Sequence, residues 1–595
     1  MKKVLILMLA LPLMVLTACE KDFAANSGSY PETDDGTVED LSHGMMVLGK
    51  RLDNPYSTEN MQEAYSSLYP TRSRDVIETT HLYVRFLPKG GDEYEQLSST
   101  GIELFDYPLD YEILVDGDYY VDPEIPDGDI TWQYAVVEKD FAFPSSIYYE
   151  VIEECCITES DAMTRAGDID IDALEREAFR LTGNEDMLAP ATKAGRNIPQ
   201  GRLTISDMNF NGGEKVGVAG VRVAANVFVK IARGYTDENG YFKVNKSFSS
   251  SKVRYRMVFK NQIGFAIGFN FILVPASVAS LGKKPSSGIE MHFTFAGDPK
   301  TWRRSTVNNA MYQYWKGREG TEIPTPPSGL RIWLMDSMTD GYTLMLHQGA
   351  VWDNSFIAKR LPFVVSLLKI FSPDMLIGVK DCDSAFDLYA DTYHEAAHAS
   401  HYMKVGKTYW NKYAASLAYN AIIGVDRFGS GRNESDEYAG ITEMWAYYYG
   451  SKLFNQRYGL NLVYGKDYWF KPQMLYDLDK AGVPSEAIFS LFTKELSTID
   501  ALEDSIVSEL GEEYGKIFDK YFGNGGSGND EGDSGGSDGG SDDGSDDGSD
   551  DGGSDGGSDD GSDDGSDDGS DDNPDDGSDD DNQHKSDPDF PKFWH

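Results

Sequence analysis

The stretch DLYADTYHEAAHASHY (residues 387–402) places three of the chain's nine histidines, His394, His398 and His401, within eight residues. His394 and His398 are four residues apart, so on an α-helix both imidazoles lie on one face, about 6 Å apart along the axis. Two imidazole nitrogens at this spacing can share one tetrahedral zinc ion. Glu395 lies beside that face, where its carboxylate can accept a proton from a zinc-bound water. The stretch therefore predicts a zinc site with Glu395 as general base.

A helix is predicted here because alanines occupy positions 396, 397 and 399, and no Gly or Pro occurs before Gly406. His401 lies seven residues after His394, about 10.5 Å further along the axis, so a straight helix cannot bring all three histidines to one zinc. We expect His401 beside the site or at the surface. Asp391, one turn before His394, can orient an imidazole. The third zinc ligand must come from another segment.

The segment ESDEYAGITEMWAYYYGSKLF (residues 434–454) offers Glu443, which precedes an apolar, helix-compatible run. Glu434 and Glu437 are competitors, but their hydrophilic surroundings predict a loop or a helix start. The alternative for Glu443 is a polar residue that caps a buried aromatic helix. The sequence does not choose the residue that stabilises a reaction oxyanion; the available donors are Arg432, Tyr438, Tyr447, Tyr448 and Tyr449.

H-E-A-A-H at 394–398 with T-E-M-W-A at 442–446 resembles the gluzincin family of zinc metallopeptidases. It does not resemble metzincins, because His401 stands at their glycine position. The resemblance covers residues 297–523 and implies zinc held by His394, His398 and Glu443. It also implies peptide-bond hydrolysis, and a sheet whose edge strand pairs with extended peptide substrates. Tyr447 departs from the family, which has an acidic residue four positions after the ligand.

The surrounding pattern fits this order of elements. Strands are predicted at 330–336, 341–346 and 375–380, before the histidine helix, and helices at 471–482, 485–496 and 501–522 after Glu443. The expected zincin-like domain therefore has a mixed sheet, an active-site helix and a helical C-terminal lobe.

The preceding part of the chain predicts two further domains. Residues 56–160 predict a small α+β domain, with a helix over 57–69 capped by Ser57, strands at 81–88 and 130–137, and a helix over 145–156. Residues 161–199 are polar and predict a linker. Residues 200–296 contain several short segments of alternating, β-branched residues, which predict a β-sandwich with TDENG (236–240) as a turn. GVAGVRV and TDENGYF resemble the carboxypeptidase regulatory-like domain, which implies a non-catalytic module. The alternative, an unrelated small sandwich, would also imply a non-catalytic module.

The N-terminal sequence predicts where in the cell the protein is located. MKK precedes an apolar run, VLILMLALPLMVL (residues 4–16), that is too short to cross a membrane. LTAC, ending at Cys19, resembles the lipobox of bacterial lipoproteins; an ordinary signal peptide is the alternative. The resemblance implies a signal peptide over 1–18, a lipid on Cys19 and a tether over 19–55. The protein would then be anchored to the bacterial outer membrane and face the periplasm or the cell surface.

The C-terminal segment 524–595 is dominated by GSDD repeats and is predicted to be disordered. The formal net charge of −46 argues against nucleic acid as a partner, because phosphates require a basic face.

The sequence thus predicts a multidomain α+β protein, a lipid-anchored zinc metallopeptidase acting on peptides or proteins. A catalytically idle zincin that serves binding or assembly is the alternative, and no specific signal favours glycan acquisition. Residues 56–160 can be a propeptide or a spacer, and the spacer is favoured because activation would otherwise discard the anchor.

Overall fold

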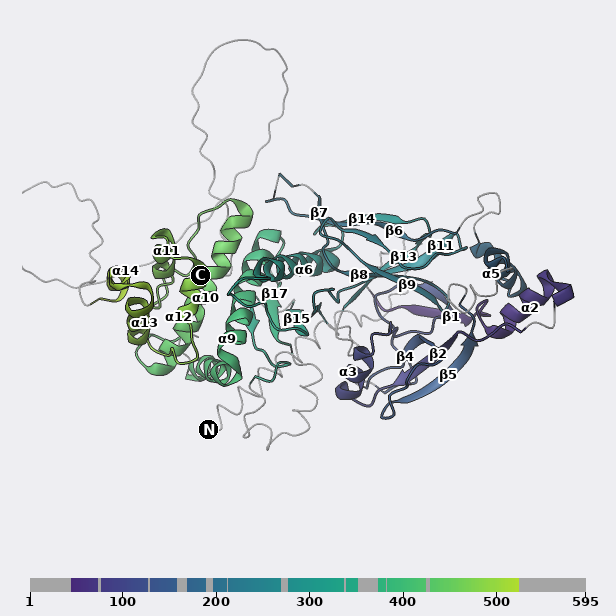
Figure 1. The fold of residues 1–595 in the computed structure, drawn as a ribbon, viewed down its shortest axis with the longest axis horizontal. Helices are drawn as coiled ribbons and strands as arrows, with labels where there is room; N and C mark the ends of the chain where they lie inside the picture. The colour runs from purple at the N-terminus through teal and green to yellow at the C-terminus, as the bar shows by residue number, and fades with distance from the viewer. Residues whose placement is uncertain are drawn as a thin grey trace, which may run out of the picture. The chain divides into compact units, whose positions relative to one another are not determined.

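The computed structural model describes most of the chain between residues 44 and 523. Strands dominate up to residue 293 and helices after residue 384, which confirms the predicted mixed α+β class (Figure 1). No helix in this part of the chain is both long and apolar enough to cross a membrane. Cys19, the predicted signal peptide and the predicted disordered tail lie outside the described residues. The described ranges are 44–72, 76–126, 129–157, 169–188, 196–210, 212–213, 215–268, 277–335, 339–350, 373–380, 382–423 and 428–523.

The N-terminal part contains a three-stranded antiparallel sheet in the order β4-β2-β5. Helix α2 begins where predicted, because the Ser57 side chain accepts a hydrogen bond from the backbone N–H of Asn60. A separate pair of strands, β1 and β3, is also antiparallel. The elements are β1 (Val47–Arg51), α2 (Thr58–Leu68), a 3₁₀ turn (Pro70–Arg72), β2 (His81–Leu87), α3 (Gly91–Ser99), β3 (Tyr111–Val115), β4 (Gln133–Glu138) and β5 (Tyr148–Cys155).

The helix predicted over residues 145–156 is wrong, because this segment forms the edge strand β5. Its residues Tyr148, Tyr149, Val151 and Ile152 are aromatic or β-branched and favour an extended backbone. Strand β2 also supplies a row of backbone partners along its whole length. That partner comes from a distant part of the chain, so the local pattern does not reveal it.

The linker predicted over residues 161–199 is wrong in part, because it contains α5 (Ile171–Leu181) and a 3₁₀ turn (Glu185–Met187). Asp170 caps α5 by accepting a hydrogen bond from the N–H of Ala173. Leu174 and Ala178 are buried against α2. The helix is short and lies between polar segments, which explains why its apolar face was missed.

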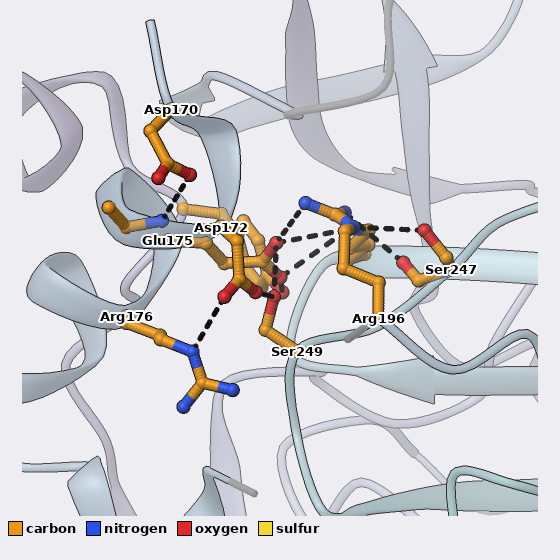
Figure 2. A network of polar contacts seen from close by, with 10 residues as sticks. Asp170, Asp172, Glu175, Arg176, Arg196, Ser247 and Ser249 are labelled. Atoms are coloured by element: carbon orange, nitrogen blue, oxygen red, sulfur yellow. Dashed lines mark hydrogen bonds and ion pairs between the residues drawn. The ribbon is translucent and has the colours of Figure 1, made fainter. Parts of the chain in front are cut away.

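Figure 2 shows the polar contacts that fasten α5 to neighbouring segments. The fully buried Glu175 carboxylate accepts hydrogen bonds from the hydroxyls of Tyr56 and Ser249. It also pairs with Arg196 at 2.9 Å and with Lys230 at 3.4 Å. Lys230 is fully buried as well, so the opposite charges compensate one another where water is excluded. α5 is therefore part of the packed structure.

Residues 200–293 form two four-stranded sheets, in the orders β10-β6-β14, with β7 also paired to β6, and β13-β11-β8-β9. The ring of Phe242 on β10 contacts that of Tyr255 on β11 with centroids 6.4 Å apart, so the sheets pack against each other. The strands are β6 (Gln200–Ser206), β7 (Lys215–Gly217), β8 (Arg222–Val227), β9 (Lys230–Tyr235), β10 (Tyr241–Lys243), β11 (Lys252–Val258), β13 (Val278–Pro285) and β14 (Ile289–Phe293).

The turn predicted at TDENG (236–240) is confirmed and links β9 to β10, which belong to different sheets. Gly240 has φ 81°, a conformation that favours glycine. The Asp237 carboxylate accepts hydrogen bonds from the backbone N–H groups of Asn239 and Tyr241. The turn thus crosses from one layer to the other.

A small mixed sheet in the order β12-β15-β17-β16 leads into the helical half; β12 precedes α6 (Pro299–Arg318) in the chain, and the other three strands follow it. β15 (Leu330–Met335) and β17 (Met375–Gly378) confirm two predicted strands. β16 is limited to Tyr342–Thr343, because Met345 has a positive φ of 53° and turns the chain. β12 (Phe265–Ile267) pairs in parallel with β15, although the prediction placed it in the sandwich.

Two long helices, α9 (Ala385–Ile423) and α10 (Glu434–Tyr458), lie side by side (Figure 1). α9 is broken at Gly406, which has φ 78° and ψ 176°. The indole N–H of Trp445 on α10 donates to the backbone oxygen of Ala397 on α9 at 3.2 Å. The later helices confirm the predicted helical end of this region: α11 (Gln473–Lys480), α12 (Ser485–Leu491), α13 (Ile499–Ser505), a π turn (Ile506–Leu510) and α14 (Glu512–Phe522).

Candidate metal centre

His394 and His398 occupy successive turns of α9, and Glu443 faces them from α10. The ligand atoms of the three side chains all lie within 4.8 Å of one another. Oε2 of Glu443 is 3.3 Å from Nε2 of His394 and 3.4 Å from Nε2 of His398. All three side chains are buried. The structure thus brings together the three residues that were predicted as metal ligands.

The distances within this group fit a bound cation. Ligand atoms 2.0–2.1 Å from a tetrahedral zinc lie about 3.3–3.4 Å from one another, which matches both separations from Oε2 of Glu443. That oxygen is buried and has no hydrogen bond within the described part of the chain. A metal ion would satisfy it. Two imidazoles and one carboxylate are also a donor set found in zinc sites with three protein ligands. The group could therefore hold one metal ion.

The charge of Glu443 suits this role. Burial raises the pKa of its carboxyl, but the neighbouring His398 and His394 lower it by more, so the pKa lies below its usual range. In the metal-free site the carboxyl is therefore ionised beside these two rings, which must themselves be neutral to bind a metal.

The two competing carboxylates lie elsewhere. Glu437 accepts a hydrogen bond from the backbone N–H of Ile499 at 3.0 Å, and Glu434 is exposed at the first residue of α10. Their segment is the helix start that its composition predicted. Neither belongs to the group that could hold a metal.

Glu395 follows His394 and is buried against β16. The Thr343 hydroxyl lies 2.6 Å from Oε2 of Glu395 and 2.9 Å from its backbone oxygen. Gly341 makes room for the same carboxylate, since a Cβ at this position would stand only 2.7 Å from Oε1. The edge of the sheet thus fixes the side chain that was predicted as general base.

The two remaining polar candidates on α9 are buried. His401 packs among aromatic rings, with centroids 5.3 Å from Tyr409 and 5.9 Å from Phe492. Burial lowers the pKa of His401 well below its ordinary value, so the ring is neutral at neutral pH. A surface position for His401 was therefore wrong. Asp391 is buried one turn before His394, and its role in orienting an imidazole stays a prediction.

Among the candidate donors, Tyr447 lies beside the ligands, with its ring centroid 4.7 Å from that of His394. Tyr448 points elsewhere, since its hydroxyl is 2.8 Å from that of Ser485. The other three are placed as follows: Tyr449 stacks on Trp445 at 4.6 Å, the Tyr438 hydroxyl donates to the backbone oxygen of Tyr409, and Arg432 is exposed before α10. An oxyanion role for Tyr447 or Tyr448 stays a prediction.

Two residues at the site were missed by the sequence analysis. The Tyr413 hydroxyl donates to Oε1 of Glu443 at 2.5 Å, and Thr343 contacts Glu395 as described above. The one available signal for Tyr413 was Gly406, which ends the straight helix shortly before the aromatic run KTYWNKY. Thr343 had no such signal, because its role depends on where β16 lies relative to α9.

A scan against protein-family models and searches of curated proteins and of solved structures found no match to this chain. The resemblances to gluzincins and to the carboxypeptidase regulatory-like domain therefore stay expectations from the sequence.

Proposed function

We propose that this protein is a membrane-anchored, zinc-dependent metallopeptidase that hydrolyses peptide bonds. The observation that carries the proposal is the convergence of His394, His398 and Glu443 on one buried point, with Glu395 next to the first histidine. Zinc held by three protein ligands lowers the pKa of its bound water to about 7 and polarises a substrate carbonyl. The remaining chemistry belongs to side chains of this chain.

Glu395 would act as the general base. Its carboxylate would accept a proton from the attacking water and pass it to the leaving amine. The Thr343 hydroxyl, 2.6 Å from Oε2, would hold this carboxylate in place for the proton transfer. Thr343 and Gly341 then act together, since one holds the carboxylate and the other leaves space for it.

The position of β16 supports a peptide as substrate. β16 pairs antiparallel with β17 and ends the four-stranded sheet in the described part of the chain. An edge strand can offer backbone groups to an extended peptide; on β16 the Thr343 backbone oxygen already accepts a hydrogen bond from the Trp410 indole N–H. Since Thr343 on this strand touches Glu395, a peptide laid along β16 would pass next to the base.

We also propose that the N-terminal part is a permanent spacer. Charged pairs join it to strand β11: the buried Arg256 pairs with the buried Glu103 at 2.5 Å, and the partly exposed Arg254 and Asp116 pair at 2.6 Å. Removing Glu103 would leave the almost fully buried Arg256 without that carboxylate, which is costly. The N-terminus of the active species tests this. An active form that begins after residue 157 would contradict a spacer.

The anchor is proposed from the sequence around Cys19. Cys19→Ser should convert a membrane-associated protein into a soluble one, because the lipid would have no attachment point. Fractionation of cells that express the variant checks this. Membrane association that persists in Cys19→Ser would contradict the lipid anchor.

The test of the enzymatic function is a peptide-library digest, with the zinc content measured on the same samples. Glu395→Gln keeps the size of the side chain and removes its basic carboxylate. We expect it to retain zinc and to lose hydrolysis by about 10²–10⁴-fold. Glu437→Gln is the matched control on α10 and should keep both. Near-normal turnover in Glu395→Gln would contradict the mechanism, and a wild-type protein that binds zinc but cleaves nothing would support the idle alternative.

A further inference from the structure

The two carboxylate oxygens of Glu443 have different partners. Oε2 faces Nε2 of His394 and of His398, at 3.3 and 3.4 Å. Oε1 accepts a hydrogen bond from the Tyr413 hydroxyl at 2.5 Å. A short hydrogen bond to an ionised oxygen is of the strong kind. The hydrogen bond therefore favours one rotation of the carboxylate, in which a single oxygen faces the histidines.

Tyr413 reaches this position only because α9 folds back at Gly406. His398 and Tyr413 are fifteen residues apart, so a straight helix would separate them by about 22 Å along its axis. Their ring centroids are instead 5.7 Å apart. Gly406 has φ 78° and ψ 176°, a combination that is essentially restricted to glycine. The break in α9 thus turns a distant tyrosine toward the metal ligands.

The Tyr413 ring is held by its surroundings. Its side chain is buried, and its centroid lies 5.0 Å from that of Trp410. Trp410 is fixed in turn, because its indole N–H donates to the backbone oxygen of Thr343 at 3.2 Å. The same folded-back segment therefore packs against β16, which carries the residue that contacts Glu395.

We propose that Tyr413 is a positioning residue for the metal ligand Glu443: its hydroxyl holds Oε1 and leaves Oε2 as the one oxygen offered to the metal. This inference rests on the proposed zinc site. Partners of a metal ligand outside the coordination sphere orient it, and their removal costs 10–100-fold in metal affinity. Tyr413 would act through Glu443 and would not itself touch the metal.

The test measures zinc affinity by competition with a chelator, in the wild-type protein and two variants. Tyr413→Phe keeps the ring and removes the hydroxyl, and we expect a 10–100-fold loss of affinity. Tyr409→Phe is the matched control. Tyr409 lies on the same segment of α9, is equally buried, and has its hydroxyl 3.1 Å from that of Thr442, the neighbour of Glu443. Its zinc affinity should equal that of the wild-type protein.

Unfolding of the zinc-free proteins separates positioning from general loosening. Each variant removes one buried hydroxyl between α9 and α10, so their unfolding midpoints should fall by similar amounts. Unchanged zinc affinity in Tyr413→Phe would overturn this inference but not the proposed zinc site. An equal loss of affinity in both variants would do the same. A wild-type protein with no measurable zinc affinity would overturn the proposed function as well.

Discussion

Gly450 of α10 lies directly against the backbone of His394 in α9, and a Cβ at residue 450 would stand 2.8 Å from both the nitrogen and the Cα of His394. No real Cβ tolerates this approach to backbone atoms, so the separation of the two helices depends on glycine. Ala446, one turn earlier on α10, is also small and fully buried. The small residues that follow Glu443 thus allow the carboxylate to reach the histidines.

Gly450→Ala should therefore push α10 away from α9. We expect a loss of about 1–3 kcal/mol in the free energy of unfolding, which is the usual cost of overpacking, together with weaker zinc binding. Gly317→Ala in α6 is the control, because a Cβ there meets nothing within 4 Å, and it should be neutral or stabilising. Urea unfolding and zinc titration check both variants. Gly450→Ala with wild-type stability and affinity would contradict the argument for close packing.

Gly341→Ala should impair catalysis while leaving the metal in place. The new Cβ would stand 2.7 Å from Oε1 of Glu395, and a carboxylate at the end of a flexible side chain moves more easily than backbone. A misplacement of about 1 Å costs on the order of 10²-fold in rate. Zinc content and peptide hydrolysis are measured together. Unchanged hydrolysis would show that the position of this carboxylate does not matter.

The buried pair Glu175 and Lys230 should make a large, coupled contribution to stability. Lys230→Met removes one of the two cations that pair with a carboxylate that has no access to water. Because Arg196 remains 2.9 Å away, the cost should be below that of an unpaired buried charge, which is about 3–5 kcal/mol. Adding Glu175→Leu to it should cost less than the two single changes combined, because the residues are in contact. Urea unfolding of the two single variants and the double variant measures this coupling. Arg180→Ala, which breaks an exposed pair with Glu177, should cost less than about 1 kcal/mol. Additive effects at Glu175 and Lys230 would contradict the network.

His81 should make the stability depend on pH. Burial, and to a smaller extent the charge of Lys246, lowers the pKa of its ring from 6.5 to about 4. Glu138 lies 3.2 Å away but is 68% exposed, so water screens its opposing effect. The unfolded chain therefore binds this proton first as the pH falls, and the free energy of unfolding decreases between about pH 6.5 and pH 4. At about 1.4 kcal/mol for each pH unit, the loss is roughly 3 kcal/mol. His81→Gln should lose correspondingly less between pH 7 and pH 4, and parallel losses in the two proteins would rule out this origin.

The predictions that held are those that depend on local spacing. His394 and His398 share a helix face because they are four residues apart, and Glu443 was found by the helical, apolar run that follows it. Ser57 caps α2 for an equally local reason. The three residues that could hold a metal ion were therefore predicted without knowing how the two helices meet.

The failures depend on partners that are distant in sequence. The segment 145–156 was predicted as a helix, but pairing with β2 makes residues 148–155 a strand. α5 was hidden because its stabilising contacts, to α2 and to Lys230, come from elsewhere in the chain. Tyr413 was missed because the sequence shows that Gly406 can break a helix but not in which direction the chain then turns. Long-range contacts decide each of these cases.

The most direct test of the account is the zinc content of purified protein, determined by elemental analysis of the wild-type chain and of matched alanine variants. We predict about one zinc per chain in the wild-type protein and in Glu437→Ala, whose side chain lies outside the ligand group. We predict none in His394→Ala or His398→Ala, and a strongly reduced content in Glu443→Ala. Full zinc content in both histidine variants would contradict the central claim that these residues hold the metal.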